Sequence, residues 1–194
     1  MISVVTPMVA PEGNQASATS QQAFGCIGMS TSPDAHFLAI TLAHETQHAK
    51  LGALADVVPL TLPDIGHRFY APWRDDPRPA SGLLHGVYAH LGIAGYWRRQ
   101  RCHEFGEVGF RAHREFARWR DAAALGAQTI AESGQLTPAG QSFVAGITNT
   151  LEAWRRESVP PEAAAHSREA ANQHLTNWRR RNGTPPLPAG QDVF

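Results

Sequence analysis

Residues 32–51, SPDAHFLAITLAHETQHAKL, form the segment around which the fold of this chain is predicted. The serine-proline start is typical of an N-cap followed by the first residue of a helix, and no further proline occurs until Pro59. We therefore predict a helix over residues 33–55. The pattern HExxH, from His44 to His48, falls in its middle. Two histidines four residues apart lie on one face of a helix, one turn apart, and can bind a single metal ion.

Glu45 is expected beside the face that carries both histidines. Its carboxylate would there reach a water on the metal, which is the place of the general base in a zinc peptidase. An iron oxygenase needs no such base, so Glu45 would instead orient a bound ligand or a metal ligand. The simplest alternative is an amphipathic helix on which His44 and His48 are ordinary polar residues.

A catalytic metal site needs a third protein ligand, because catalytic zinc usually has three and an open position. The extended pattern HExxHxxGxxH is excluded, since positions 51 and 54 are both leucine. No glutamate occurs between Glu45 and Glu104, so the common downstream glutamate is missing. The carboxylates that remain in this interval are Asp56, Asp64, Asp75 and Asp76.

The histidines of a second predicted helix, over residues 81–101, are stronger candidates. His90 shares the apolar face of that helix, which consists of Leu83, Val87, Ala94 and Trp97. His85 lies on another face and is the second choice. His67 and His103 are weaker, because they fall in a loop and at a helix junction. Three nitrogen ligands would suit iron as well as zinc, so the metal stays open.

The composition favours one folded domain over residues 1–194. The formal net charge is zero, so no excess charge points to a nucleic acid. No apolar run reaches the length of a membrane span and residues 1–10 lack signal-peptide features, so we expect a cytoplasmic protein without a membrane partner. Cys26 and Cys102 form no CxxC pair and are predicted to be buried free thiols.

The remaining segments predict a mainly α fold with a small β element near the N-terminus. Residues 1–22 are expected to be a loose segment, with an edge strand over residues 2–9 and a loop over residues 11–22. Residues 23–29 are predicted to form a further short strand. Ser81 is the expected cap of the second helix. The other predicted segments are three helices, over residues 104–132, over residues 138–156 with its start at Thr137-Pro138, and over residues 161–181 with its stop at Gly183. A proline-rich tail over residues 184–194 follows.

Residues 59–79, between the first two helices, are rich in proline and predicted to be irregular. Their centre, RFYAPWRDDPRP over residues 68–79, alternates aromatic and basic residues with prolines. Such a segment is either a surface loop that covers the edge of the core or a wall of an active site with an arginine for an anionic group. The second interpretation gives Tyr70 and Trp73 substrate contacts.

Several of these segments together resemble one group of proteins. The matching stretches are AFG at residues 23–25, LAHETQHAKL at 42–51, FYAPWRDDPRP at 69–79, GLL at 82–84 and YAHLG at 88–92. They are similar to the HExxH-motif proteins of gene clusters that make ribosomally synthesised, post-translationally modified peptides. Such proteins occur alone or as the C-terminal domain of radical-SAM maturases of the FxsB type. The chain looks like the members described as α-ketoglutarate-dependent HExxH-type peptide β-hydroxylases, and the match covers residues 23–101.

The resemblance implies an iron(II) oxygenase that uses α-ketoglutarate and O₂ to hydroxylate the β-carbon of a residue in a precursor peptide. By position, it implies His44 and His48 as iron ligands, with His90 as the third. It also implies that Arg74 or Arg78 binds the distal carboxylate of α-ketoglutarate through a bidentate ion pair.

Three further expectations accompany the resemblance. Lys50, one turn beyond the histidine pair, is another candidate for the α-ketoglutarate carboxylate. Family members carry a long segment ahead of the region that matches Ala23, so this chain is either a trimmed version or has a partner, a separate maturase or a complementing chain. Two other functions stay open: a zinc metallopeptidase with Glu45 as general base, and a non-catalytic module that binds a precursor peptide or a maturase.

Overall fold

The fold is known from a computed structural model that describes residues 2–10, 15–20, 23–31, 34–185 and 188. Helices dominate these residues, and a small sheet lies near the N-terminus, which confirms the predicted fold class. The elements are β1 (Val4–Pro7), β2 (Ser17–Thr19), β3 (Cys26–Met29), α1 (Ala35–Val57), α2 (Ala80–Gln100), α3 (Gly106–Glu132), α4 (Pro138–Arg155) and α5 (Pro161–Asn182).

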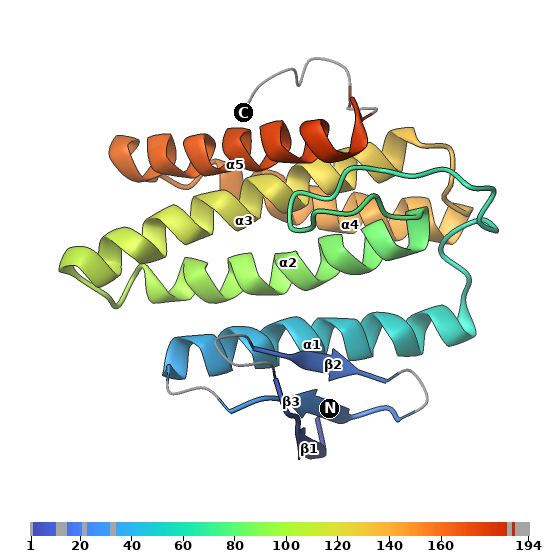
Figure 1. Ribbon diagram of the computed structural model, residues 1–194, viewed down its shortest axis with the longest axis horizontal. Coiled ribbons are helices and arrows are strands. Elements are labelled where there is room, and N and C mark those ends of the chain that lie inside the picture. Colours follow the sequence, from blue (N-terminus) through green and yellow to red (C-terminus); the bar gives the residue numbers. More distant parts are fainter. Residues whose placement is uncertain (1, 11–14, 21–22, 32–33, 186–187, 189–194) are drawn as a thin grey trace.

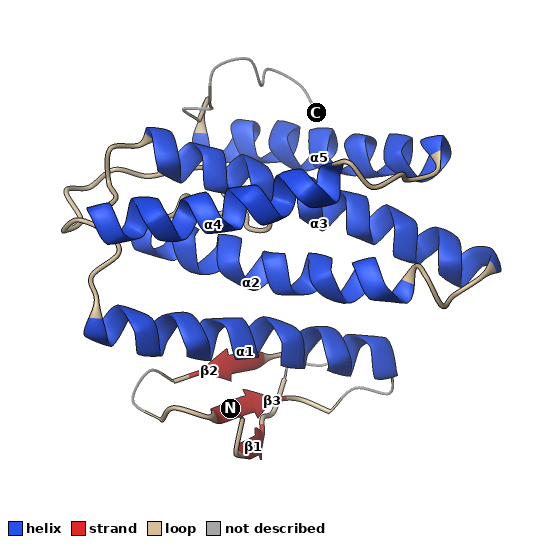
Figure 2. Cartoon of the chain, turned by 180° about the vertical axis from the view of Figure 1, so that it is seen from behind, coloured by secondary structure: helices blue, strands red, loops and turns tan. Residues whose placement is uncertain are grey.

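Helix α1 lies between the sheet and the other helices. Both views place the strands on one side of α1 and α2 on the other, with α3, α4 and α5 beyond α2 (Figure 1, Figure 2). Asp34 caps the helix, since its Oδ1 accepts a hydrogen bond from the His36 N–H at 2.8 Å. The predicted cap at Ser32 and the first helical residue at Pro33 lie outside the described residues. Because α1 is covered on two sides, even its polar residues Thr41 and Glu45 are buried.

The sheet has the order β1-β3-β2, with β1 parallel and β2 antiparallel to β3. The predicted edge strand corresponds to β1, and the predicted strand over residues 23–29 corresponds to β3. The predicted loop over residues 11–22, and with it the loose character of residues 1–22, is wrong at Ser17–Thr19, because these residues form the paired strand β2. Short polar β2 owes its conformation to its pairing with β3, which strand propensity does not reveal.

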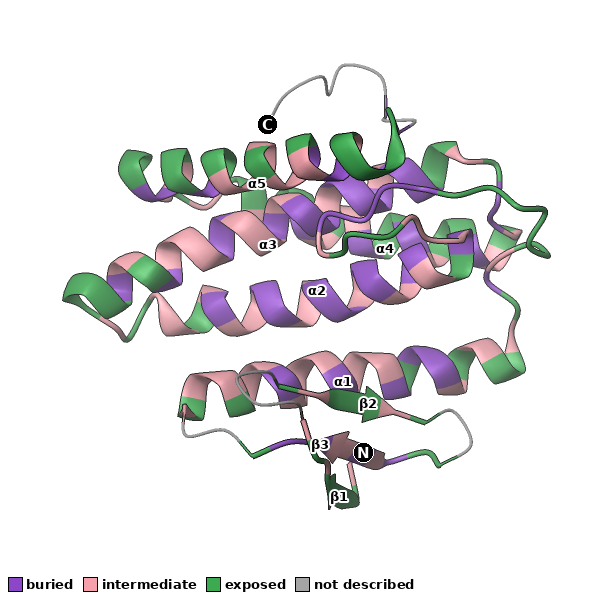
Figure 3. Cartoon of the chain, in the orientation of Figure 1, coloured by how far each residue is buried: buried purple, intermediate pink, exposed green. Residues whose placement is uncertain are grey.

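Helix α2 carries the face that was predicted to be buried. Its residues Leu83, Val87, His90, Ala94 and Trp97 are all buried, and they recur along the helix (Figure 3). Pro79 takes the cap position, so the prediction of Ser81 as the cap is wrong, and Ser81 lies inside the helix. A helix that begins at Ala80 fits the preceding proline, whose fixed φ leads directly into the first turn.

The last two helices begin at the predicted residues and end within one residue of the predicted ends. Thr137 caps α4, since its hydroxyl accepts a hydrogen bond from the Gly140 N–H at 3.0 Å. Helix α5 stops at Gly183, which has a φ of 83° that favours glycine. Most of the proline-rich tail lies outside the described residues.

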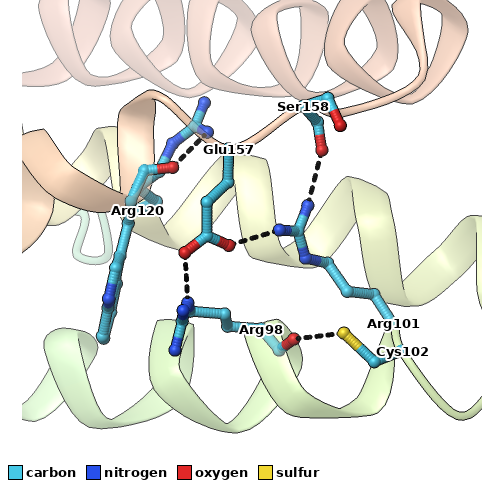
Figure 4. Close-up of polar contacts among 7 residues, drawn as sticks. Arg98, Arg101, Cys102, Arg120, Glu157 and Ser158 are labelled. Atoms are coloured by element: carbon cyan, nitrogen blue, oxygen red, sulfur yellow. Dashed lines mark hydrogen bonds and ion pairs between the residues drawn. The ribbon is translucent and has the colours of Figure 1, made fainter.

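A cluster of charged residues fastens the end of α2 to the segment between α4 and α5 (Figure 4). Glu157 accepts a hydrogen bond from Arg98 Nε at 2.6 Å and a second from Arg101. Arg101 also donates to the carbonyl oxygen of Ser158 at 2.8 Å. The helix end is therefore held by charge-assisted hydrogen bonds, which are stronger than neutral ones.

Both cysteines are free thiols, as predicted, but neither is fully buried. Cys26 is half-buried and Cys102 is exposed. Cys102 follows α2 and donates to the Arg98 carbonyl oxygen at 3.6 Å, on the outside of the charged cluster (Figure 4). Among the helices of the described residues, none combines the length and apolar character that crossing a membrane requires.

Candidate metal centre

His44 and His48 face each other on α1. Their Nε2 atoms lie 3.1 Å apart, and their rings meet edge to face. Two nitrogens bound to one metal ion at about 2.1 Å stand about 3.0–3.4 Å apart for bond angles between a right angle and a tetrahedral one. The spacing therefore fits a pair of ligands to one ion, as HExxH predicts.

Both rings of the pair are held in the neutral form that a metal requires. Burial lowers the pKa of His48 to about 4, the neighbouring His44 lowers it as well, and Glu45 opposes the shift. Burial also lowers the pKa of His44, again against the effect of Glu45. Nδ1 of His44 is buried without a hydrogen-bond partner. An imidazole that keeps its lone pairs at neutral pH is a ready metal ligand.

His90 projects from α2 toward the pair. It is buried, and its ring centroid lies 5.4 Å from that of His44. Its Nδ1 lies 2.8 Å from the Gly86 carbonyl oxygen, which can only accept, so the proton is on Nδ1 and the lone pair on Nε2. Burial lowers the pKa of His90 to about 3. This tautomer is the one that binds a metal through Nε2.

His85 lies on the other side of His48. The two rings stack at 5.7 Å, and their Nδ1 atoms lie 3.5 Å apart. His85 therefore contacts the nitrogen of His48 that points away from His44. In this position His85 is better suited to orient His48 than to serve as a third metal ligand.

Within the described residues, no three His, Cys, Asp or Glu side chains stand together in the geometry of a bound metal ion. The chemistry of the donor set nevertheless fits a metal, since His44 and His48 converge and His90 adds a lone pair beside them. The pair is therefore the core of the site, and its third ligand is part of the function proposed below.

Glu45 points toward the sheet. The hydroxyl of Ser17 donates to its Oε1 at 2.7 Å, and the hydroxyl of Thr19 donates to its Oε2. Thr19 also donates to the Glu45 carbonyl oxygen at 3.3 Å. Both carboxylate oxygens are thus engaged by β2, and the residue is buried. Neither Ser17 nor Thr19 was predicted as a site residue, because two hydroxyl residues in a polar segment carry no distinctive signal.

The segment of residues 59–79 folds back on itself beside the histidines. Phe69 and Arg78 form a backbone bridge, with the Phe69 N–H donating to the Arg78 carbonyl at 2.8 Å and the reverse bond at 2.9 Å. Trp73, between them, stacks on His90 with centroids 4.4 Å apart. A Cβ at Gly86 would lie 2.5 Å from the Trp73 ring, so this glycine makes room for the indole.

Arg74 and Arg78 share one carboxylate in this segment. Arg74 Nε donates to Asp76 Oδ1 at 2.7 Å, and Arg78 Nη1 donates to Oδ2 at 3.1 Å. The hydrogen bond from Arg74 is the main cause of the lowered pKa of Asp76. The two guanidinium groups are therefore held together by Asp76 at the border of the histidine site.

Two neighbouring cavities meet at the histidines. One, of about 440 Å³, is lined by β2 and by Glu45 of α1. The other, of about 700 Å³, is lined by Trp73, Arg78 and His90. Residues common to both are His44, His48, Arg74 and His85. The predicted metal ligands and arginines thus line two adjoining hollows beside α1.

Two predicted contact residues lie elsewhere. Tyr70 is 1% exposed, its hydroxyl lies 2.8 Å from Nδ1 of His174, and its ring packs against Trp178, both in α5. It lines neither cavity, so its position is that of a core residue and not of the predicted substrate contact. Lys50 is exposed, donates to Gln47 Oε1 at 3.0 Å and lies over the ring of Tyr88 in α2, and it lines neither cavity.

The chain matches no protein-family model and no curated protein.

Proposed function

We propose that the chain is an iron(II)- and α-ketoglutarate-dependent dioxygenase that hydroxylates a side-chain β-carbon in a ribosomally synthesised precursor peptide. The observation that carries the proposal is the juxtaposition of the converging His44 and His48 nitrogens with two arginines on one hollow. The histidines supply nitrogen ligands, and the arginines supply the groups that bind a dicarboxylate.

His44, His48 and His90 would hold the iron. The Nδ1–H of His90 donates to the Gly86 carbonyl, which fixes the ring and keeps the lone pair on Nε2. Trp73 covers one face of the His90 ring and shields it from water. His85 sits against Nδ1 of His48 and orients that ring.

Arg74 or Arg78 would bind the distal carboxylate of α-ketoglutarate. Each guanidinium group uses one nitrogen for Asp76, Nε in Arg74 and Nη1 in Arg78. A planar guanidinium group has five N–H donors, so it can bind a second carboxylate beside the first. Asp76 would then keep both arginines in place while the cosubstrate is bound.

Glu45 distinguishes this proposal from a zinc metallopeptidase. A peptidase requires a carboxylate oxygen that accepts a proton from metal-bound water. Here each carboxylate oxygen accepts a hydroxyl hydrogen bond from β2, which supports a role in positioning the strand. The peptidase remains the second candidate because Glu45 also lines the cavity next to His44 and His48.

When bound, iron with α-ketoglutarate and O₂ supplies the oxidising chemistry. One oxygen atom of O₂ enters the peptide C–H bond, the other enters succinate, and CO₂ leaves. The partners in this proposal are the precursor peptide and a separate maturase or complementing chain, in the cytoplasm. The non-catalytic alternative binds the same peptide without any turnover.

The test is O₂-dependent formation of succinate by the purified chain supplied with Fe(II) and α-ketoglutarate. We expect succinate, and its loss in His44→Ala. Cleavage of a peptide by the zinc-loaded chain, with no succinate from the iron-loaded one, would contradict the proposal and favour the peptidase. Neither activity, together with tight peptide binding, would favour the non-catalytic module.

A further inference from the structure

Strand β2 has an open edge. It pairs with β3 on one side, and within the described residues no strand pairs with its other side. The Ser30 N–H donates to the Ala16 carbonyl oxygen at 2.8 Å, so the backbone groups of Ala16 point toward β3. In an antiparallel pair, every second residue directs its backbone N–H and C=O groups to the partner strand, so those of Ala18 also point toward β3. The backbone N–H and C=O groups of Ser17 and Thr19 therefore point to the open edge.

This edge belongs to the wall of the smaller cavity. Four consecutive residues, from Ser17 to Ser20, line the cavity of about 440 Å³ together with His44 and His48. The histidine pair and the residues of β2 that carry the outward backbone groups thus line one hollow. An extended chain that paired with β2 would run past both histidines.

The contact with α1 holds this edge in place. The side chains of Ser17 and Thr19 point to the same face of the strand, where both hydroxyls donate to the buried carboxylate of Glu45. Hydrogen bonds to a charged acceptor are stronger than neutral ones. The position of the strand is therefore fixed relative to His44 and His48 before any ligand arrives.

We infer that the open edge of β2 binds an extended segment of the peptide substrate as an additional strand, through the backbone groups of Ser17 and Thr19. This inference rests on the proposed function, because it names the way in which the peptide of that reaction is bound. Main-chain hydrogen bonds of this kind recognise a peptide largely independently of its sequence. They suit a site whose substrate is one stretch of a longer chain.

The pairing also determines which peptide side chains face the metal centre. Residues directly opposite each other in two paired strands carry their side chains on the same face. The peptide residues opposite Ser17 and Thr19 therefore point toward α1, and the residue between them points away. Phe24, which is 59% exposed and lines the same cavity, offers an apolar contact to the bound segment. The modified residue belongs to the set that faces α1.

The experiment uses a probe peptide chosen from a displayed library of random ten-residue sequences selected on the metal-free chain. The best binder is synthesised with blocked ends, and each of its backbone nitrogens is methylated in turn. We expect affinity to fall by at least about tenfold at every second position, and amide hydrogen exchange of Ser17 and Thr19 to slow by a similar factor while Ala18 is unchanged. No selectable peptide, a loss without the two-residue period, or unchanged exchange at Ser17 and Thr19 would overturn the inference.

Two substitutions at one position provide the matched control. Thr19→Pro removes the outward N–H and is expected to weaken probe binding by at least about tenfold, because proline has no donor. Thr19→Val keeps that N–H and removes only the hydroxyl, so its loss of binding should be clearly smaller than the loss in Thr19→Pro. Equal losses in both variants would contradict pairing through the backbone.

The test of peptide docking and the test of the oxygenase reaction can fail independently. Succinate formation from α-ketoglutarate without any peptide tests the iron chemistry alone. If succinate forms but the loss of affinity on methylation has no two-residue period, the docking is overturned and the oxygenase is retained. If the loss of affinity has the two-residue period but no succinate forms, the docking is retained and the oxygenase is overturned.

Discussion

The indole of Trp73 stacks on the imidazole of His90, with the rings nearly parallel at 16° and their centroids 4.4 Å apart. The contact joins the irregular segment of residues 59–79 to α2 at the candidate third ligand. Gly86, one turn before His90, leaves the space that the indole fills. The shape of the candidate metal centre therefore depends on a loop residue and on a glycine, neither of which is a candidate ligand.

Removal of the indole should loosen the fold and the metal site together. We expect Trp73→Ala to lower the free energy of unfolding by about 2–3 kcal/mol, less than for a fully buried tryptophan because Trp73 is half-buried. It should also weaken metal binding, since the His90 ring loses its cover. Urea denaturation without metal and a competition assay with a chelator measure the two effects. Trp73→Phe keeps a ring and should restore most of both; equal effects of Phe and Ala would contradict a role for stacking.

Gly86→Ala should destabilise the chain although alanine favours helices. The added Cβ would lie 2.5 Å from the Trp73 ring, and overpacking of this kind costs about 1–3 kcal/mol. Gly146 in α4 is the matched control, because its Cβ would meet no atom within 4 Å. Gly146→Ala should therefore stabilise by up to about 1 kcal/mol. In the Trp73→Ala background the cost of Gly86→Ala should vanish, and an unchanged cost there would rule out the steric cause.

Glu45→Gln separates the two enzymatic candidates. Glutamine is neutral and cannot act as a general base, so a peptidase would lose its activity. For the oxygenase we expect succinate formation to fall by no more than about tenfold, because Glu45 holds β2 and takes no proton. The double variant Ser17→Ala/Thr19→Val removes the same contacts from the other side and should have a similar effect. Complete loss in Glu45→Gln with near-normal activity in the double variant would contradict this role.

The free energy of unfolding should decrease at acidic pH because of His174. Burial lowers the pKa of His174 in the folded state, against the effect of Asp75. As the pH falls below about 6.5, the unfolded chain binds a proton here that the folded chain does not, so the free energy of unfolding decreases. His174→Asn keeps an acceptor near the Tyr70 hydroxyl without the titration. Its melting temperature should therefore fall less than that of the unaltered chain between about pH 7 and pH 5. A parallel fall in both proteins would show that His174 does not contribute.

Periodicity predicted the parts of the fold that are governed by local pattern. The spacing of His44 and His48 placed them on one face of α1, and the apolar stripe of α2 placed His90 in the interior. Thr137 and Gly183 marked helix ends because capping depends on a single residue and its neighbours. These features require no knowledge of which elements come together.

Other features depend on contacts between distant segments. Ser17 and Thr19 form a strand and bind Glu45 only because β3 and α1 lie on either side of them. Tyr70 and Trp73 are three residues apart in one segment, yet the turn of that segment sends Tyr70 to α5 and Trp73 to His90. No property of the isolated segment decides between these two directions, so the sequence could not separate the core residue from the site residue.

The measurement that tests the central claim most directly is the anaerobic titration of the Fe(II)-loaded chain with α-ketoglutarate, followed by the visible metal-to-ligand charge-transfer band. We expect a new band that bleaches on exposure to O₂ with formation of succinate. The band should be lost in His90→Ala and retained, with iron affinity weakened by about 10–100-fold, in His85→Ala. No band in a chain that holds zinc tightly and stoichiometrically would contradict the oxygenase, and a band that survives His90→Ala would contradict the assignment of the third ligand.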